Sequence, residues 1–392
     1  MSKTNSLAAI LPVLFGFFIM GFCDIVGISS DYAKEAFGWS NTMTGFIPSM
    51  VFIWFLFFSI PVGIQMNRWG RKRTVLLSML VTVIGMAIPL LKTSVACVMG
   101  YALLGIGNAM LQVSLNPLLS NVVTNKKLLT SSLTAGQVVK AVSSFAGPFL
   151  MLFAVNVLGG GDDGNWYYVF PVLGALTLIS GVWLLLTPIP REVSESSTVT
   201  TRATFALLKD NVILLLFFGI FFAVGIDVAT NYISSKIMIT QYNWTKEAAG
   251  AAPQVYFVCR TIGAFIGVFV CSRFSERSYF RLNIVACIVV ILVLALVTVQ
   301  TVSLVCIGAV GFLCSCIFPT IYSLAVQRYP DKANLISGLM ITAVAGGGAV
   351  TPVIGIAMDA VGITGGIFVL LICAAYLTYC AYCVKVVAKN ND

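Results

Sequence analysis

Apolar runs follow one another along the whole chain, and each is about as long as a helix needs to be to cross a bilayer. About 20 consecutive apolar residues span the hydrocarbon core of a membrane. The ninth and tenth runs have almost no polar joint between them, so their division is the least marked. The pattern predicts an all-α integral membrane protein with twelve transmembrane helices, at residues 7–29, 43–66, 74–92, 95–121, 131–157, 167–188, 211–240, 247–271, 281–300, 302–326, 334–358 and 363–387.

One long polar stretch, residues 190–210, separates six runs from six. Each half opens with an apolar run that contains an aspartate, Asp24 in the first half and Asp227 in the second. Repetition in the same orientation is typical of transporters built from parallel repeats. We therefore expect an N-terminal six-helix bundle at 1–189, a cytoplasmic linker at 190–210 and a C-terminal six-helix bundle at 211–392, with a central cavity between the bundles.

The charged residues are few and unevenly placed. Only 9% of the residues are charged and 59% are hydrophobic, whereas a soluble domain has about 25% charged residues. Most of the 23 basic residues lie on alternate polar joints, and the positive-inside rule then places both termini in the cytoplasm. Topology and contact with membrane lipid account for the net charge of +9, so no nucleic-acid partner is expected. The first run lacks a small-residue cleavage pattern and is expected to be retained.

Several classes of function are disfavoured by composition. The chain has no histidine, and its eleven cysteines are scattered, so we expect small buried thiols, no metal site and no cofactor. The absence of a nucleophile–base pair argues against a membrane enzyme, and the absence of a large cytoplasmic domain argues against a transporter-like sensor.

Residues 63–73, with the sequence GIQMNRWGRKR, connect the second and third runs. They resemble the Gly-x-x-x-Asp-Arg-x-Gly-Arg-Lys motif of the major facilitator superfamily, with Asn67 in the place of the usual aspartate. The tight turn needs glycine at Gly70, and arginine side chains can cap helix carbonyl ends. The glycine-rich stretch before Pro352 indicates either a gate or bend in the eleventh run or tight helix packing, and the two are compatible. The residues expected to act in gating are Gly63, Asn67, Arg68, Gly70, Arg71, Arg273, Gly347 and Pro352.

Four further segments narrow the resemblance. They are 111–117 (LQVSLNP), 259–274 (beginning CRTIG and ending SRF), 318–324 (FPTIYSL) and 346–355 (GGGAVTPVIG). Together they resemble the fucose/glucose/galactose–proton symporter family over nearly the whole chain. This resemblance implies a major facilitator fold in the cell inner membrane, a monomer, and import of a small sugar together with protons by alternating access.

The family implies roles for individual residues in the first half. Asp24 falls at a proton-linked carboxylate. Gln112 falls where the family has a second glutamate, and an amide cannot take a proton. Gln137 and Lys140 fall where the family has a glutamine and an asparagine that face the cavity.

In the second half, Asp227 stands where a glutamine or glutamate is usual, and Asn231 stands where one member has tryptophan. Sugar sites need amides and carboxylates for hydroxyl groups, together with aromatic surfaces. The expected proton-coupling residues are Asp24 and Asp227. The expected substrate-binding residues are Gln112, Asn116, Gln137, Lys140, Asn231, Arg260, Tyr256 and Tyr322.

Charges inside a membrane are costly and usually pair or face water. We expect Asp24 to pair with Lys140 and Asp227 to pair with Arg260. Each pair is either a permanent structural ion pair or one that weakens and lets the carboxylate take a proton. Two alternatives to a proton-coupled sugar carrier stay open. Lys140 and Arg260 could bind an anionic substrate such as a sialic or uronic acid, and Gln112 could mark a proton-independent facilitator.

Overall fold

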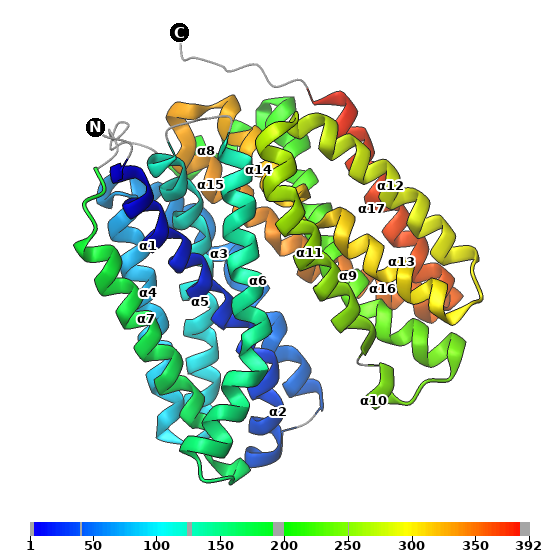
Figure 1. Ribbon diagram of the computed structural model, residues 1–392, viewed down its shortest axis with the longest axis horizontal. Coiled ribbons are helices and arrows are strands. Elements are labelled where there is room, and N and C mark those ends of the chain that lie inside the picture. The colour runs from blue at the N-terminus through cyan, green and yellow to red at the C-terminus, as the bar shows by residue number, and fades with distance from the viewer. Residues whose placement is uncertain (1–3, 40, 124–127, 191–199, 250, 385–392) are drawn as a thin grey trace. The chain divides into compact units, whose positions relative to one another are not determined.

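The computed structural model describes residues 4–39, 41–123, 128–190, 200–249 and 251–384, and these residues are almost all helical (Figure 1). Within these ranges eleven helices are long and apolar enough to cross a membrane. They are Val51–Trp69, Arg71–Leu91, Ser94–Val122, Leu129–Leu158, Gly164–Leu186, Asn211–Tyr242, Ala251–Arg273, Glu276–Leu296, Gln300–Arg328, Pro330–Val361 and Ile363–Cys383. The predicted all-α membrane architecture is confirmed.

The first predicted run is not one continuous α-helix. Helix α1 (Thr4–Gly21) leads into a short 3₁₀ segment, η1 (Phe22–Asp24), and α2 (Ile25–Phe37) follows. The helical chain therefore continues beyond the predicted end at residue 29, but it is interrupted at Asp24. A stretch of 3₁₀ helix inside a longer helix often marks a functional hinge.

The remaining helices largely follow the apolar runs. They are α3 (Asn41–Trp69), α4 (Arg71–Ala87), α5 (Ser94–Val122), α6 (Leu129–Phe153), α7 (Val169–Leu186), α8 (Thr201–Ala206), α9 (Asn211–Tyr242), α10 (Lys246–Ala249), α11 (Ala251–Arg273), α12 (Glu276–Leu296), α13 (Gln300–Cys314), α14 (Ile317–Arg328), α15 (Ala333–Thr342), α16 (Gly346–Val361) and α17 (Ile363–Cys383). The weakly marked joint between the ninth and tenth runs lies at 297–299, a few residues before its predicted place.

The eleventh run is not one continuous α-helix, and its irregular segment lies directly before the three glycines. A 3₁₀ segment, η8 (Ala343–Ala345), separates α15 from α16. Gly346 begins α16, and a Cβ atom there would lie 2.2 Å from the carbonyl oxygen of Phe221 in α9. The glycine stretch therefore serves close helix packing beside the irregular segment.

The helices form two compact units. Unit 1 contains Met1–Lys126, Gly136–Thr204 and Lys332–Thr342, and unit 2 contains Lys127–Ala135, Phe205–Asp331 and Ala343–Asp392. Each unit thus includes a short segment from the other half of the sequence. The predicted division into bundles at residues 190–210 stays a prediction, and residues 191–199 of that linker lie outside the described residues.

In unit 1, small residues bring α1 close to two neighbours. A Cβ atom on Gly16 would lie 2.8 Å from Leu115 of α5, and one on Gly21 would lie 2.6 Å from the carbonyl oxygen of Lys140 in α6. Such approaches are possible because glycine has no side chain. The broken first helix therefore packs against both α5 and α6.

In unit 2, Asp210 anchors the start of α9. Its carboxylate accepts hydrogen bonds from the backbone N–H of Val212 at 2.9 Å, from Nη2 of Arg328 at 3.0 Å and from the hydroxyl of Tyr329 at 2.9 Å. Burial opposes the charge of this carboxylate, but the hydrogen bonds from Tyr329, Val212 and Arg328 outweigh it, so the pKa of Asp210 is lowered. The cluster ties the amino end of α9 to the end of α14.

We expect Asp210→Ala to lower the free energy of unfolding by roughly 3 kcal/mol, because it leaves the largely buried guanidinium of Arg328 without this carboxylate. A carboxyl group whose folded pKa is lowered stabilises the fold above its unfolded pKa of about 3.9. That stabilisation disappears as the pH falls through the lower folded value. Thermal unfolding in detergent between pH 7 and pH 3 measures both effects. Asp162→Ala, at an exposed turn, is the matched control, and an equal loss in both variants would contradict the role of Asp210.

Candidate functional site

Asp227, Tyr256 and Arg260 meet in unit 2. Asp227 lies in the middle of α9, and the other two residues lie one turn apart on α11. Nε of Arg260 lies 2.9 Å from Oδ1 of Asp227, and the hydroxyl of Tyr256 donates a hydrogen bond to the same oxygen. The predicted Asp227–Arg260 pair is confirmed.

The ring of Tyr256 is held rigidly against α13. It is fully buried, and a Cβ atom added to Gly311 would lie 3.0 Å from its Cδ2 atom. Gly311 therefore leaves the space that the ring occupies. This packing fixes where the hydroxyl of Tyr256 points.

Asn231 and Tyr322 are the other two residues of the second half that were predicted to bind substrate, and they lie on different helices. Asn231 is half-buried one turn after Asp227 on α9. Tyr322 is fully buried on α14, where its ring lies 6.2 Å from the ring of Phe318.

In unit 1, three amide side chains lie along one face of α5. Asn108, Gln112 and Asn116 follow one another at intervals of four residues, and all three are buried. Among the described residues, Oδ1 of Asn108 and Oδ1 of Asn116 are buried without a hydrogen-bond partner. Nearly all buried polar atoms in proteins have partners, so these acceptors call for a ligand, a water molecule or a change of conformation.

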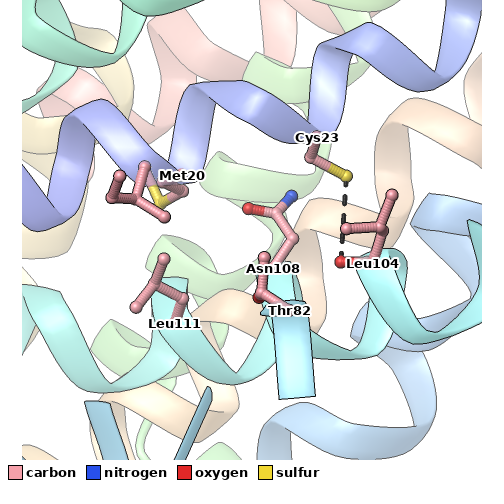
Figure 2. A pocket seen from close by; sticks show the side chains of 7 residues that line it. Met20, Cys23, Thr82, Leu104, Asn108 and Leu111 are labelled. Carbon is pink, nitrogen blue, oxygen red and sulfur yellow. Dashed lines mark hydrogen bonds between the residues drawn. The ribbon is translucent and has the colours of Figure 1, made fainter. Parts of the chain in front are cut away.

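A small cavity opens beside this row. It is lined by Ile19, Met20, Cys23, Thr82, Leu104, Asn108 and Leu111, and Figure 2 shows the Asn108 amide projecting toward the first helix. Its volume of about 10 Å³ suits about one water molecule. It is too small for a sugar.

Gln137 and Lys140 lie one turn apart near the middle of α6. Nε2 of Gln137 is buried and has no partner among the described residues. The side chain of Lys140 is half-buried, and no described residue gives it a hydrogen bond or an ion pair. The side chain of Asp24 lies outside the described residues, so the Asp24–Lys140 pair stays a prediction.

Residues from the motif between α3 and α4 bind α15 through side-chain amides. Nδ2 of Asn334 donates to Oδ1 of Asn67 at 2.6 Å, and Nε of Arg71 donates to Oδ1 of Asn334 at 2.6 Å. Asn67 therefore makes a neutral contact where the family motif has a carboxylate.

A second hydrogen bond to α15 depends on a proline. Pro117 lies inside α5 and has no N–H, so the carbonyl of Val113 loses its helical partner. The hydroxyl of Ser337 donates to that carbonyl at 2.6 Å. Gly63 and Gly338 allow the close approach of α3 and α15, since a Cβ atom on Gly338 would lie 2.8 Å from the carbonyl oxygen of Ser59.

The other predicted gating residues have simpler surroundings. Gly70 has φ of 84° before α4, a conformation that favours glycine, so the predicted tight turn is confirmed. Arg68 and Arg273 are exposed, Gly347 is buried, and Pro352 lies inside α16. Their role in gating stays a prediction.

Unit 2 contains a similar set of contacts around Glu276 at the start of α12. Its carboxylate accepts hydrogen bonds from Thr130 of α6 and, at 2.9 Å, from Nε2 of Gln327. The hydroxyl of Ser131 donates to the carbonyl of Val268 at 2.6 Å. The beginning of α6 is thereby attached to α11, α12 and α14.

The sequence analysis missed several of these residues. Asn108 could have been found by extending the four-residue spacing back from Gln112. Asn334 and Glu276 are polar residues at the starts of apolar runs, where polar residues are common. Among the described residues, no group of three or more His, Cys, Asp or Glu side chains could hold a metal ion.

Long apolar helices, a buried row of amides and an ion pair between two of these helices define a polytopic membrane protein. The chain belongs to the Major Facilitator Superfamily, which it matches over residues 10–352. It is therefore a transporter and not an enzyme.

Similar proteins point the same way. The chain is 24% identical to a glucose/galactose transporter of Brucella abortus biovar 1 (strain 9-941), over 96% of this chain and 94% of that protein. The crystal structure of the E. coli fucose:proton symporter FucP superposes with a TM-score of 0.84 at 18% identity, over 97% and 99% of the two chains. The human organic anion transporter MFSD10 gives a TM-score of 0.73 at 11% identity, over 97% and 100%. At these identities the structural likeness establishes the fold alone.

Proposed function

We propose that this protein imports a small sugar together with protons across the cell inner membrane, with both termini in the cytoplasm. The observation that carries this proposal is the buried row Asn108, Gln112 and Asn116, with its two unpaired acceptors. Sugar hydroxyl groups both donate and accept hydrogen bonds, so they match such a row. The similarity to a glucose/galactose transporter and to a fucose:proton symporter supports the same substrate class.

Asp24 is the proposed proton carrier. It ends the 3₁₀ segment that interrupts the first helix, and a change at such a break can alter the surroundings of a carboxylate. Movement between a wet and a less hydrated site would shift its affinity for a proton. Gln112 takes no proton, so Asp24 is the proposed coupling group of the first half.

Alternating access requires contacts that break and reform. In unit 1 the proposed gate contacts are those of α15 with Asn67, Arg71 and Val113, and in unit 2 they are the α6 contacts around Glu276. Both sets attach a segment from one half of the sequence to helices of the other half. We propose that the protein works as a monomer surrounded by membrane lipid.

Thermal unfolding of the purified protein in the presence of D-glucose, D-galactose or L-fucose tests the substrate class. A sugar at a hundred times its Kd stabilises the folded state by about 2.7 kcal/mol. Counterflow in proteoliposomes then tests carriage. Stabilisation followed by counterflow of the same sugar supports the proposal, and binding without counterflow would exclude transport.

Lys140 favours a second candidate substrate, an anionic sugar such as a sialic or uronic acid. If its ammonium group binds a substrate carboxylate, Lys140→Ala should weaken binding of the sugar acid about tenfold or more, since charged hydrogen bonds contribute about 1.5–3 kcal/mol. Binding of neutral sugars should change little. The matched control is Lys236→Ala, which also removes a lysine ammonium group. Nζ of Lys236 lies 4.6 Å from the ring centre of Tyr232. Equal affinities for N-acetylneuraminate in wild type and Lys140→Ala, measured by calorimetry, would exclude this candidate.

A further inference from the structure

We propose that Asp227 accepts a hydrogen bond from a substrate hydroxyl group through its Oδ2 atom. Tyr256 is its positioning residue. The inference rests on the proposed sugar transport, and it assigns one polar contact between the protein and the sugar.

The two oxygens of Asp227 have different surroundings. Both Nε of Arg260 and the hydroxyl of Tyr256 bind Oδ1. Among the described residues, none donates a hydrogen bond to Oδ2. A carboxylate oxygen has room for two hydrogen bonds, so Oδ2 remains available to a ligand.

The exposed part of the pair must face water. The Asp227 side chain is 25% exposed and the Arg260 side chain is 31% exposed. Charged side chains in membrane-spanning helices face the protein interior or a water-filled cavity, because contact with lipid is costly. A solute in that water can therefore reach the exposed part of the Asp227 side chain.

Groups on two other helices surround Asp227. Arg260 on α11 supplies a full positive charge at 2.9 Å, and Tyr256 adds a neutral donor. The Cys314 thiol of α13 is also near.

The position of Oδ2 is set by packing. Gly311 makes room for the buried ring of Tyr256, and the Tyr256 hydroxyl and Arg260 together fix the carboxylate plane. This is the arrangement expected of a pre-oriented binding group, because its geometry does not change when the ligand arrives.

Hydroxyl groups are the chemistry that this oxygen would recognise. An O–H donor bound to an ionised carboxylate makes a short and strong hydrogen bond. A sugar lacking the bound hydroxyl would leave a charged acceptor unpaired, so the site would discriminate against one deoxy position.

The test measures the affinity of wild type and Asp227→Asn for D-galactose and its 2-, 3-, 4- and 6-deoxy derivatives, with thermal unfolding of each variant as a check of folding. We expect one deoxy sugar to bind wild type about tenfold or more weakly than galactose. Asp227→Asn should bind galactose that weakly too, and it should no longer distinguish that deoxy sugar. At saturating sugar it should still accumulate galactose when a pH gradient is imposed.

Tyr256→Phe keeps the ion pair and removes only the orienting hydroxyl. It should raise the KM for galactose severalfold and leave the maximal rate and the pH profile unchanged, whereas Tyr101→Phe, at another buried tyrosine, should change neither. Unchanged deoxy-sugar discrimination in Asp227→Asn would overturn the hydroxyl contact. Loss of pH-driven accumulation at unchanged affinity would make Asp227 the proton carrier. No binding of any tested neutral sugar to wild type would instead overturn the proposed function.

Discussion

Replacement of Asp24 by asparagine is expected to abolish proton-driven accumulation of sugar and to leave sugar exchange intact. If one proton moves with each sugar, a gradient of one pH unit supports about tenfold accumulation, because one pH unit corresponds to about 1.36 kcal/mol. Asparagine keeps the size and polarity of the side chain but cannot bind the proton. The accumulation ratio of Asp24→Asn should therefore fall to about one, while counterflow without a gradient continues.

Radiolabelled sugar uptake into proteoliposomes with an imposed pH gradient measures this ratio. Glu35→Gln is the matched control, since Glu35 is an exposed acid on α2 in the same part of the chain. It should accumulate sugar like wild type. Full gradient-driven accumulation in Asp24→Asn would exclude Asp24 as the carrier.

The second large effect is expected at the crossing of α3 and α15. Gly338→Val would place a branched side chain where even a Cβ atom lies 2.8 Å from the backbone oxygen of Ser59 and 3.2 Å from Cα of Gly63. The helices would have to separate, and this would break the hydrogen bonds of Asn334 to Asn67 and Arg71 and of Ser337 to Val113. We expect transport to fall to a few per cent of wild type because the proposed gate no longer closes.

Hydrogen–deuterium exchange of residues 333–342 measures this separation directly. The amides of α15 should exchange about tenfold faster in Gly338→Val, corresponding to a loss of about 1.4 kcal/mol of local stability. Gly355→Ala is the control, because no atom lies within 4 Å of a Cβ atom built there. Unchanged exchange in α15 together with normal transport would show that this contact is not part of a gate.

Much of the architecture could be predicted from the sequence because the membrane imposes a simple rule on it. Backbone polar groups must be satisfied within each spanning segment, so apolar runs of sufficient length become helices. The same reasoning predicted the pairing of Asp227 with Arg260, because a membrane makes isolated charges costly. The break at Asp24 was not predicted, because local propensity does not fix where a helix tightens into a 3₁₀ turn.

The contacts of the candidate site depend on the register between helices that are distant in the sequence. Pro117 leaves the carbonyl group of Val113 without its helical partner, and only the structure shows that Ser337 binds it. Tyr256 was one of several aromatic candidates, and only its packing against Gly311 directs its hydroxyl to Asp227. Asn67 stands where the motif usually has aspartate, and only the structure shows that its amide oxygen accepts a hydrogen bond from Asn334.

The most direct test of proton-coupled sugar transport is the pH of a weakly buffered suspension of proteoliposomes when sugar is added outside. Valinomycin and potassium keep the membrane potential at zero during the measurement. The account predicts an immediate rise in external pH in wild type, because protons enter with the sugar, and no rise in Asp24→Asn. Sugar that equilibrates across the membrane without any change of pH in wild type would contradict proton coupling and identify a facilitator.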